Sequence, residues 1–153
     1  MKKSIAAVFF MICVLSAFAN EKQTSIGIAP EFNMDSRHNF AGGIALSFNH
    51  RLKDDVAVGL SITASSNFYA IRVLEPAFIF RRYMPENNYT GFFVQGELGA
   101  FIIFEEGDIT PLFNVGIGGG YRFPLGSIFY IEPYARFGYP FAYAIGVSTG
   151  ICF

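Results

Sequence analysis

Seven charged residues stand inside segments that are otherwise apolar or built from small residues. They are four glutamates and three arginines: Glu31, Glu75, Glu97, Glu132, Arg81, Arg122 and Arg136. An isolated ion removed from water costs many kcal/mol, whereas an arginine can hold a carboxylate through two parallel hydrogen bonds. If these side chains share one confined interior, we expect them to form an interlocked network of ion pairs.

Such a network allows more than one role. The leading interpretation is a structural plug; the alternatives are a gate whose re-pairing opens a thin water path, and a proton-linked switch. Two segments that carry these charges also resemble each other, because Leu74–Arg81 and Ile131–Phe137 share an apolar-Glu-Pro opening followed by aromatic and arginine positions. We predict that they place Glu and Arg similarly. Because proline cannot donate to a sheet ladder, we expect bulges or strand-end irregularities at Pro76 and Pro133.

Other candidate sites are weaker. His38 and His50 flank one whole strand-like segment, which places them at opposite ends of it as solvated turn residues and excludes a shared metal site or acid–base pair. The glycines of Gly116–Gly120 lack the following helix that a phosphate-binding loop requires. The acidic cluster Glu105–Asp108 is interpreted as a solvated turn rather than a divalent-cation site. We therefore expect no metal, no cofactor and no enzymatic activity.

The segments that must position the charges alternate with a period of two. In the last one, Tyr143, Ile145, Val147, Thr149, Ile151 and Phe153 form a bulky apolar face, and the residues between them are small. The same division recurs along the chain, and turn-forming stretches separate the segments. We predict eight strands: Ser25–Met34, Phe40–Asn49, Val56–Thr63, Arg72–Tyr83, Gly91–Phe104, Leu112–Phe123, Ile128–Gly138 and Tyr143–Phe153.

The bulky faces indicate a lipid solvent outside the strands. A soluble barrel or sandwich would place scattered charge opposite its apolar face, whereas here the second face is mostly Gly, Ala and Ser, which suits a narrow barrel interior. Ten steps of a tilted strand give a height of about 25 Å, which matches the apolar band of membrane barrels. The predicted fold class is all-β, an eight-stranded antiparallel up-and-down transmembrane β-barrel. Arg72 and Arg82 point outward near strand ends, where they can reach lipid headgroups.

The first 19 residues indicate export. Lys2 and Lys3 precede an apolar stretch that ends in small residues, with Ala17 and Ala19 in an A-x-A arrangement, so we predict a signal peptide over residues 1–19 and a barrel domain over 20–153. Without the two lysines, 9 basic side chains remain against 12 acidic ones, a formal charge of −3 that gives no reason to expect nucleic-acid binding. Cys152 would then lack a partner for an internal disulfide.

The signal sequence, the eight alternating segments and the C-terminal pattern resemble the small eight-stranded outer-membrane barrels, the group with the OmpA membrane domain and its OmpX-like and OmpW-like relatives. The residues ending in Phe153 are similar to the β-signal read by the outer-membrane assembly machinery. The resemblance implies a bacterial outer-membrane location, contact with lipid and lipopolysaccharide, and a monomer. We expect the protein to depart from these relatives in having no peptidoglycan-binding domain, no long protruding strands, no room for a large vestibule, and no His and Ser arrangement like that of lipid-A-modifying barrel enzymes.

The expected function is a non-enzymatic barrel with a structural role in envelope integrity and a plugged lumen. With both termini on the periplasmic side, the outer connections are short and offer little surface for recognition. One alternative is a narrow channel or small-ligand conduit gated by the Glu and Arg network. Another is a soluble periplasmic barrel that holds a hydrophobic ligand.

Overall fold

The computed structural model describes residues 24–35, 40–67, 72–84, 90–105 and 108–153. The predicted signal peptide, with Ala17 and Ala19, and His38 lie outside these residues. Among the described residues, no helix is long and apolar enough to cross a membrane. The strands are β1 (Thr24–Asp35), β2 (Phe40–Arg51), β3 (Val56–Ser66), β4 (Arg72–Met84), β5 (Gly91–Glu105), β6 (Asp108–Leu125), β7 (Phe129–Tyr139) and β8 (Phe141–Cys152).

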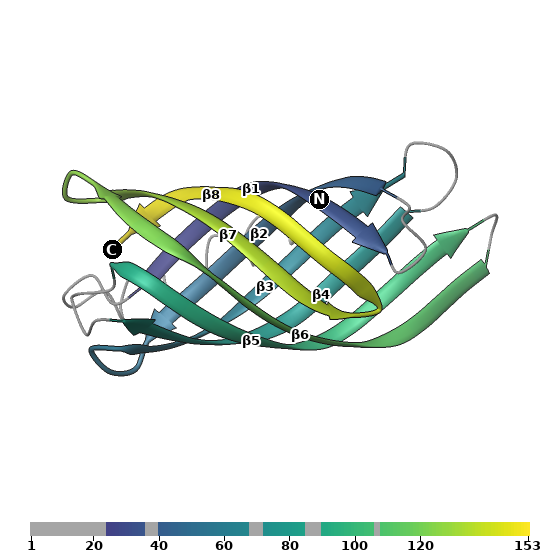
Figure 1. The fold of residues 1–153 in the computed structure, drawn as a ribbon, viewed down its shortest axis with the longest axis horizontal. Helices are drawn as coiled ribbons and strands as arrows, with labels where there is room; N and C mark the ends of the chain where they lie inside the picture. The colour runs from purple at the N-terminus through teal and green to yellow at the C-terminus, as the bar shows by residue number, and fades with distance from the viewer. Residues whose placement is uncertain (1–23, 36–39, 68–71, 85–89, 106–107) are drawn as a thin grey trace, which may run out of the picture.

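The strands form one closed barrel (Figure 1). Each strand pairs antiparallel with the next in the chain, and β8 pairs antiparallel with β1, so these strands leave no open sheet edge. The closing pair is joined at its end by hydrogen bonds in both directions between Thr24 and Phe153. A closed barrel satisfies the backbone groups between strands, which is what a strand structure in hydrocarbon requires. The predicted eight-stranded up-and-down architecture is confirmed.

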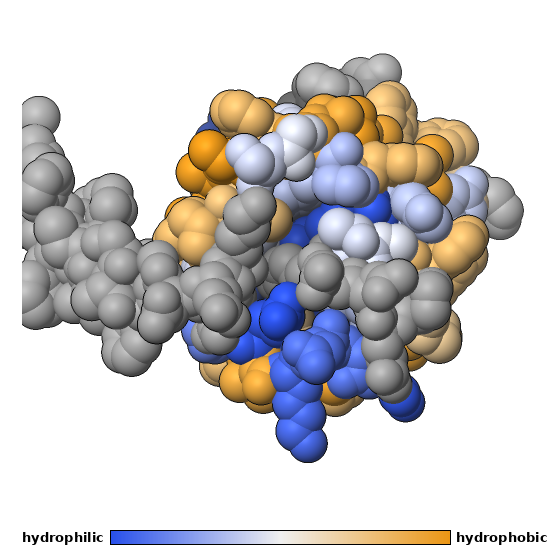
Figure 2. Space-filling view, turned by 90° about the vertical axis from the view of Figure 1, so that its left-hand side faces the viewer, coloured by the Kyte–Doolittle hydropathy of each residue, from blue (hydrophilic) through white to orange (hydrophobic). Residues whose placement is uncertain are grey.

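The two faces of each strand differ as the alternation predicts. Large apolar side chains cover the outside, including Phe32, Phe78 and Ile117, whose exposed fractions are 65%, 69% and 69%. Seen from the end at which β1 begins and β8 ends, apolar residues surround the barrel and hydrophilic residues gather at its end face (Figure 2). In water such a surface would be a large exposed apolar patch, whereas in a bilayer it contacts lipid.

Glycines on the inner wall make room for long side chains from the neighbouring strand. A Cβ atom added to Gly146 of β8 would lie 2.7 Å from both Cζ and Oη of Tyr134, and one added to Gly150 would lie 2.6 Å from Oη of Tyr130. Both distances are well inside van der Waals contact. The small residues of the inner face therefore leave free the space that the tyrosines on β7 occupy.

The expected bulges at Pro76 and Pro133 are absent, and this prediction is wrong. The β4·β5 pairing skips Glu75 and Pro76 but resumes in the same register, and the β6·β7 pairing does the same around Pro133. Pro30 interrupts the β1·β8 pairing in this way too. Because a strand residue directs its N–H to only one neighbour, a proline removes pairing on one side while the other side holds the register. The register shift recorded among the described strands lies instead between Met34 and Asp35.

Two predicted turns are partly strand. His50 lies within β2, where its backbone faces Thr24 on β1 and Val58 on β3, so it is not a turn residue. Strand β6 begins at Asp108 rather than Leu112, because Glu105 and Asp108 pair directly across the β5·β6 hairpin. In both places backbone pairing between the strands continues past the last residues that show the alternation of apolar and small side chains. The acidic cluster therefore stands at two strand ends, and residues 106 and 107 lie outside the described part.

We predict that Gly146→Val destabilises the barrel by about 1–3 kcal/mol, because the new side chain displaces the Tyr134 ring. Gly96→Val on β5 is the matched control, since no heavy atom lies within 4 Å of a Cβ added there. Urea unfolding in detergent, followed by the gel mobility of unboiled samples, measures both. Equal unfolding midpoints for the two variants would contradict the steric account.

Candidate functional site

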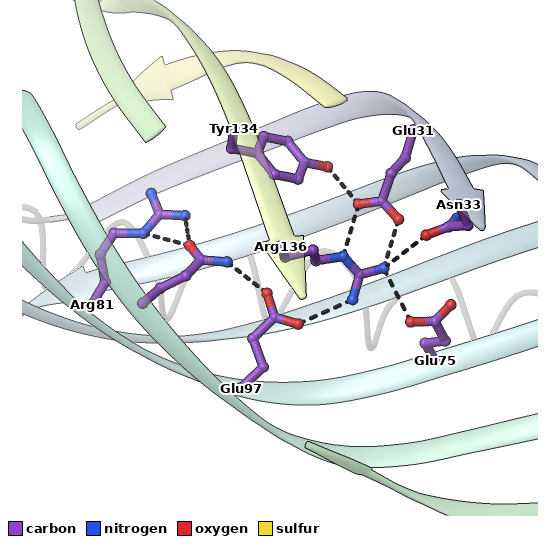
Figure 3. A network of polar contacts seen from close by, with 8 residues as sticks. Glu31, Asn33, Glu75, Arg81, Glu97, Tyr134 and Arg136 are labelled. Carbon is purple, nitrogen blue, oxygen red and sulfur yellow. Dashed lines mark hydrogen bonds and ion pairs between the residues drawn. The ribbon is translucent and has the colours of Figure 1, made fainter. Parts of the chain in front are cut away.

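Arg136 on β7 is the centre of a network of ion pairs inside the barrel (Figure 3). Its Nη2 atom lies 2.6 Å from Oε1 of Glu31 and 3.0 Å from Oε2 of Glu75, and its Nη1 atom lies 3.0 Å from Oε2 of Glu97. Its Nε donates a further hydrogen bond to Glu31, and Nη2 also reaches Oδ1 of Asn33 at 3.4 Å. One guanidinium thus holds three carboxylates that come from β1, β4 and β5.

A second group of ion pairs surrounds Glu132, also on β7. Nη1 of Arg81 lies 2.8 Å from Oε1 of Glu132, and Nε of Arg122 lies 2.6 Å from its Oε2. Gln95 joins the two groups, because its carbonyl oxygen accepts hydrogen bonds from Arg81 and its amide donates to Oε1 of Glu97 at 2.6 Å. The polar contacts therefore run without a break from Glu31 to Arg122.

The structure places all seven charged residues predicted for the lumen on the inner wall. Each is nearly inaccessible to solvent, with exposed fractions between 1% for Glu75 and Arg122 and 6% for Glu97. They come from β1, β4, β5, β6 and β7. The remaining strands contribute short inward side chains around the charges, among them Ala45, Ser47, Ser61, Thr63 and Ser148.

The two similar segments exchange partners. Glu75 of β4 binds Arg136 of β7, and Glu132 of β7 binds Arg81 of β4. The two segments thus place Glu and Arg similarly, as predicted, and each glutamate binds the arginine of the other segment. The two strands that carry them, β4 and β7, are not neighbours in the sheet. These contacts tie opposite walls together across the lumen.

Each of the three buried arginines also lies over an aromatic ring. The guanidinium carbon is 4.0 Å from the ring centroid for Arg81 over Phe93 and for Arg122 over Tyr130, and 4.4 Å for Arg136 over Phe141. A cation over a ring face is attracted by the quadrupole of the ring, more strongly when water is excluded. The rings therefore help to stabilise Arg81 and Arg122, two cations that share the single carboxylate of Glu132.

The sequence analysis missed several members of this site. Tyr134 donates a hydrogen bond to Oε2 of Glu31 at 2.7 Å, Gln95 bridges the two groups, and Asn33 contacts Arg136. All three share the inward parity of the charged residues on their own strands. That parity is the signal that could have found these three residues. The same signal could have found Phe93 and Tyr130, the rings that lie against Arg81 and Arg122.

The charges are distributed unevenly along the barrel. Around Arg136 stand three carboxylates, and around Glu132 stand two guanidinium groups. Little free space remains between them, since the cavity among these side chains has a volume of about 40 Å³. By volume this is room for a few water molecules. The arrangement can hold charge and a short run of water, and nothing larger.

The other predicted residues take ordinary positions. Ile145, Val147, Thr149 and Ile151 of the C-terminal pattern face outward on β8, whereas Tyr143 and Phe153 are half-buried. Arg72 is exposed, and Arg82, also exposed, pairs with Asp55 at 2.9 Å. Nδ1 of His50 lies 3.1 Å from the hydroxyl of Thr24. Within the described part of the chain, no group of three His, Cys, Asp or Glu side chains could hold a metal ion.

Comparison with solved structures identifies the fold. Neisserial surface protein A superimposes with a TM-score of 0.64 at 10% identity, over 85% of this chain and 96% of that one. The N-terminal β-barrel domain of Pseudomonas aeruginosa OprF gives 0.54 at 16% identity, over 84% and 97%. The attachment invasion locus protein Ail of Yersinia pestis gives 0.53 at 15% identity, over 85% and 96%. The sequence matches no protein-family model and no curated protein.

This chain has the fold of the small eight-stranded outer-membrane barrels. The resemblance predicted from the alternation and the C-terminal pattern is confirmed at the level of fold. Combined with the apolar exterior, the fold makes the chain a transmembrane β-barrel. Identities this low carry no activity, ligand or partner from those proteins to this one.

We predict that Arg136→Met destabilises the barrel by about 3–5 kcal/mol, because it leaves three buried carboxylates without their counter-ion. Arg82→Met is the control, since its ion pair is exposed and worth about 0–1 kcal/mol. Urea titrations of both variants in the same detergent measure the difference. Adding Glu75→Gln to Arg136→Met should recover part of the loss. An Arg136→Met midpoint equal to that of Arg82→Met would show that the network does not stabilise the fold.

Proposed function

We propose that this protein is a non-enzymatic integral protein of a bacterial outer membrane, with a structural role in the envelope and a lumen closed by its Glu and Arg network. The observation that carries the proposal is Arg136, which is bound to carboxylates from three other strands in the middle of the lumen. This contact links β7 to β1, β4 and β5 across the lumen, which supports both a closed lumen and a braced wall.

The physical argument for a closed lumen is the cost of opening it. A hydrated ion that passes must displace side chains that already hold one another in ion pairs. Breaking a buried pair by removing one partner costs about 3–5 kcal/mol, and Arg136 holds three carboxylates at once. The free volume of about 40 Å³ among the charges is too small for a continuous hydrated column.

The expected location and partners belong to the same proposal. A signal peptide over residues 1–19 would export the chain, and the alternating C-terminal residues that end at Phe153 would be read by the outer-membrane assembly machinery. The apolar exterior would contact outer-membrane lipid and lipopolysaccharide. The protein would act as a monomer, because its first and last strands already pair with each other. The exposed apolar wall gives no support to a soluble periplasmic barrel.

A gated conduit is the second candidate, and Gln95 favours it. This side chain stands between Arg81 and Glu97, accepting from the first and donating to the second. If it rotated away, Arg81 could exchange Glu132 for Glu97, and Arg122 would keep Glu132 alone. Such re-pairing changes which part of the lumen is blocked without leaving a charge unpaired.

We predict that the purified protein inserted into planar lipid bilayers gives no steady conductance. Insertion is verified independently, because a folded closed barrel resists detergent and should shift in gel mobility on boiling. A regular unitary conductance from heat-modifiable protein would contradict the plug and favour the conduit.

Glu97→Gln and Arg122→Gln separate the two candidates further. A structural plug predicts a lower yield of folded protein with unchanged ion leak, because the buried partners lose their counter-charge. A gate predicts raised permeability at normal folded yield. Asp54→Asn serves as the control in both measurements, since this carboxylate is 84% exposed and pairs with Arg51 at the barrel end.

A further inference from the structure

A cavity of about 460 Å³ opens at the end of the barrel opposite to the end at which β1 begins. It lies beyond the ion-pair network, and its lining comes from all eight strands. Most of the wall is apolar, with Phe101, Ile103, Leu112 and Phe141 facing it, and its volume falls within the range of small-molecule pockets. At its inner end stand two polar side chains, Asn33 and Glu75.

Both polar side chains keep unused hydrogen-bonding capacity. Glu75 is 1% exposed and Asn33 6% exposed, yet Oε1 of Glu75 and Nδ2 of Asn33 have no hydrogen-bond partner. Figure 3 shows that each residue turns its other polar atom to Arg136, so these two atoms point away from the network. A buried polar atom without a partner costs about 1–3 kcal/mol, and a ligand that pairs with it removes this cost.

The charge beside the cavity selects the ligand. Among the described residues, Arg136 is the one guanidinium that contacts Glu31, Glu75 and Glu97, so this end of the network holds two more negative charges than positive ones. Glu105 adds a further carboxylate to the cavity lining. Such a field attracts a cation and repels an anion.

We propose that this cavity binds a small protonated amine that carries an apolar group. The ammonium donates to Oε1 of Glu75, an oxygen on the ligand accepts from Nδ2 of Asn33 where one is present, and the apolar group packs against Phe101 and Ile103. A bare metal ion fits poorly, because hard cations require about six oxygen ligands and the wall here is largely apolar. The site does not depend on whether the lumen conducts ions.

The test is a titration of the detergent-purified, heat-modifiable protein with 2-phenylethylamine, followed by amide chemical shifts in NMR spectra. The matched probes are 2-phenylethanol, which lacks the charge, and 3-phenylpropanoate, which reverses it. We expect saturable shifts at Ile103 and Leu112 with the amine, and binding at least about tenfold weaker with the alcohol and the acid. Equal affinity for amine and alcohol, or no saturable shift with the amine, would overturn the proposal.

Two substitutions locate the amine. Glu75→Gln keeps the size of the side chain and removes its charge, and it should raise the Kd for 2-phenylethylamine at least about tenfold. Asp54→Asn makes the same charge change at the other end and should leave the Kd unaltered. Ala41→Phe places a ring in the cavity and should abolish binding. An unchanged Kd in folded Glu75→Gln or Ala41→Phe protein would place the amine elsewhere and refute the site.

Discussion

The contact between Arg136 and the carboxylates of Glu31, Glu75 and Glu97 is the interaction on which the interior depends. Three carboxylates this close repel one another, and without a counter-ion they would be buried charges at a cost that no small barrel could carry. Because they come from three strands, the same guanidinium that binds them also fixes the distances between those strands. The pairing of the buried charges and the cross-section of the barrel are therefore one constraint.

The network explains why the rest of the wall is built from small residues. Long arginine, glutamate and tyrosine side chains fill the lumen, so the residues around them on the inner wall must be glycine, alanine and serine, as Gly146 is beside Tyr134 on the neighbouring strand. Bulky apolar residues are left to the outside, where lipid accepts them. The distribution is therefore the reverse of that in a soluble domain, with polar side chains inside and bulky apolar ones outside. The inside follows from the narrow lumen of an eight-stranded barrel, which has no room for a long side chain at every inward position.

Much of this could be predicted from the alternation. A period of two places Glu97 and Arg122 inside and Phe78 outside whatever their partners are, and the structure agrees. Strand ends were less predictable. His50 and Asp108 look like turn residues because they are polar, yet backbone pairing continues through them. Pro76 and Pro133 suggested bulges because the sequence does not reveal that the second neighbour of each strand holds the register.

What the sequence by itself determined is parity: which residues face lipid, which face the lumen, and that the buried charges must pair. Only the tertiary structure decided the pairs, that Arg136 serves three glutamates, that Arg81 crosses the barrel to Glu132, and that Gln95 and Tyr134 complete the network. The physical reason is that alternation is a local property of one strand, set by its pleat. The separation between two side chains across the lumen depends instead on barrel closure and on the stagger of all eight strands.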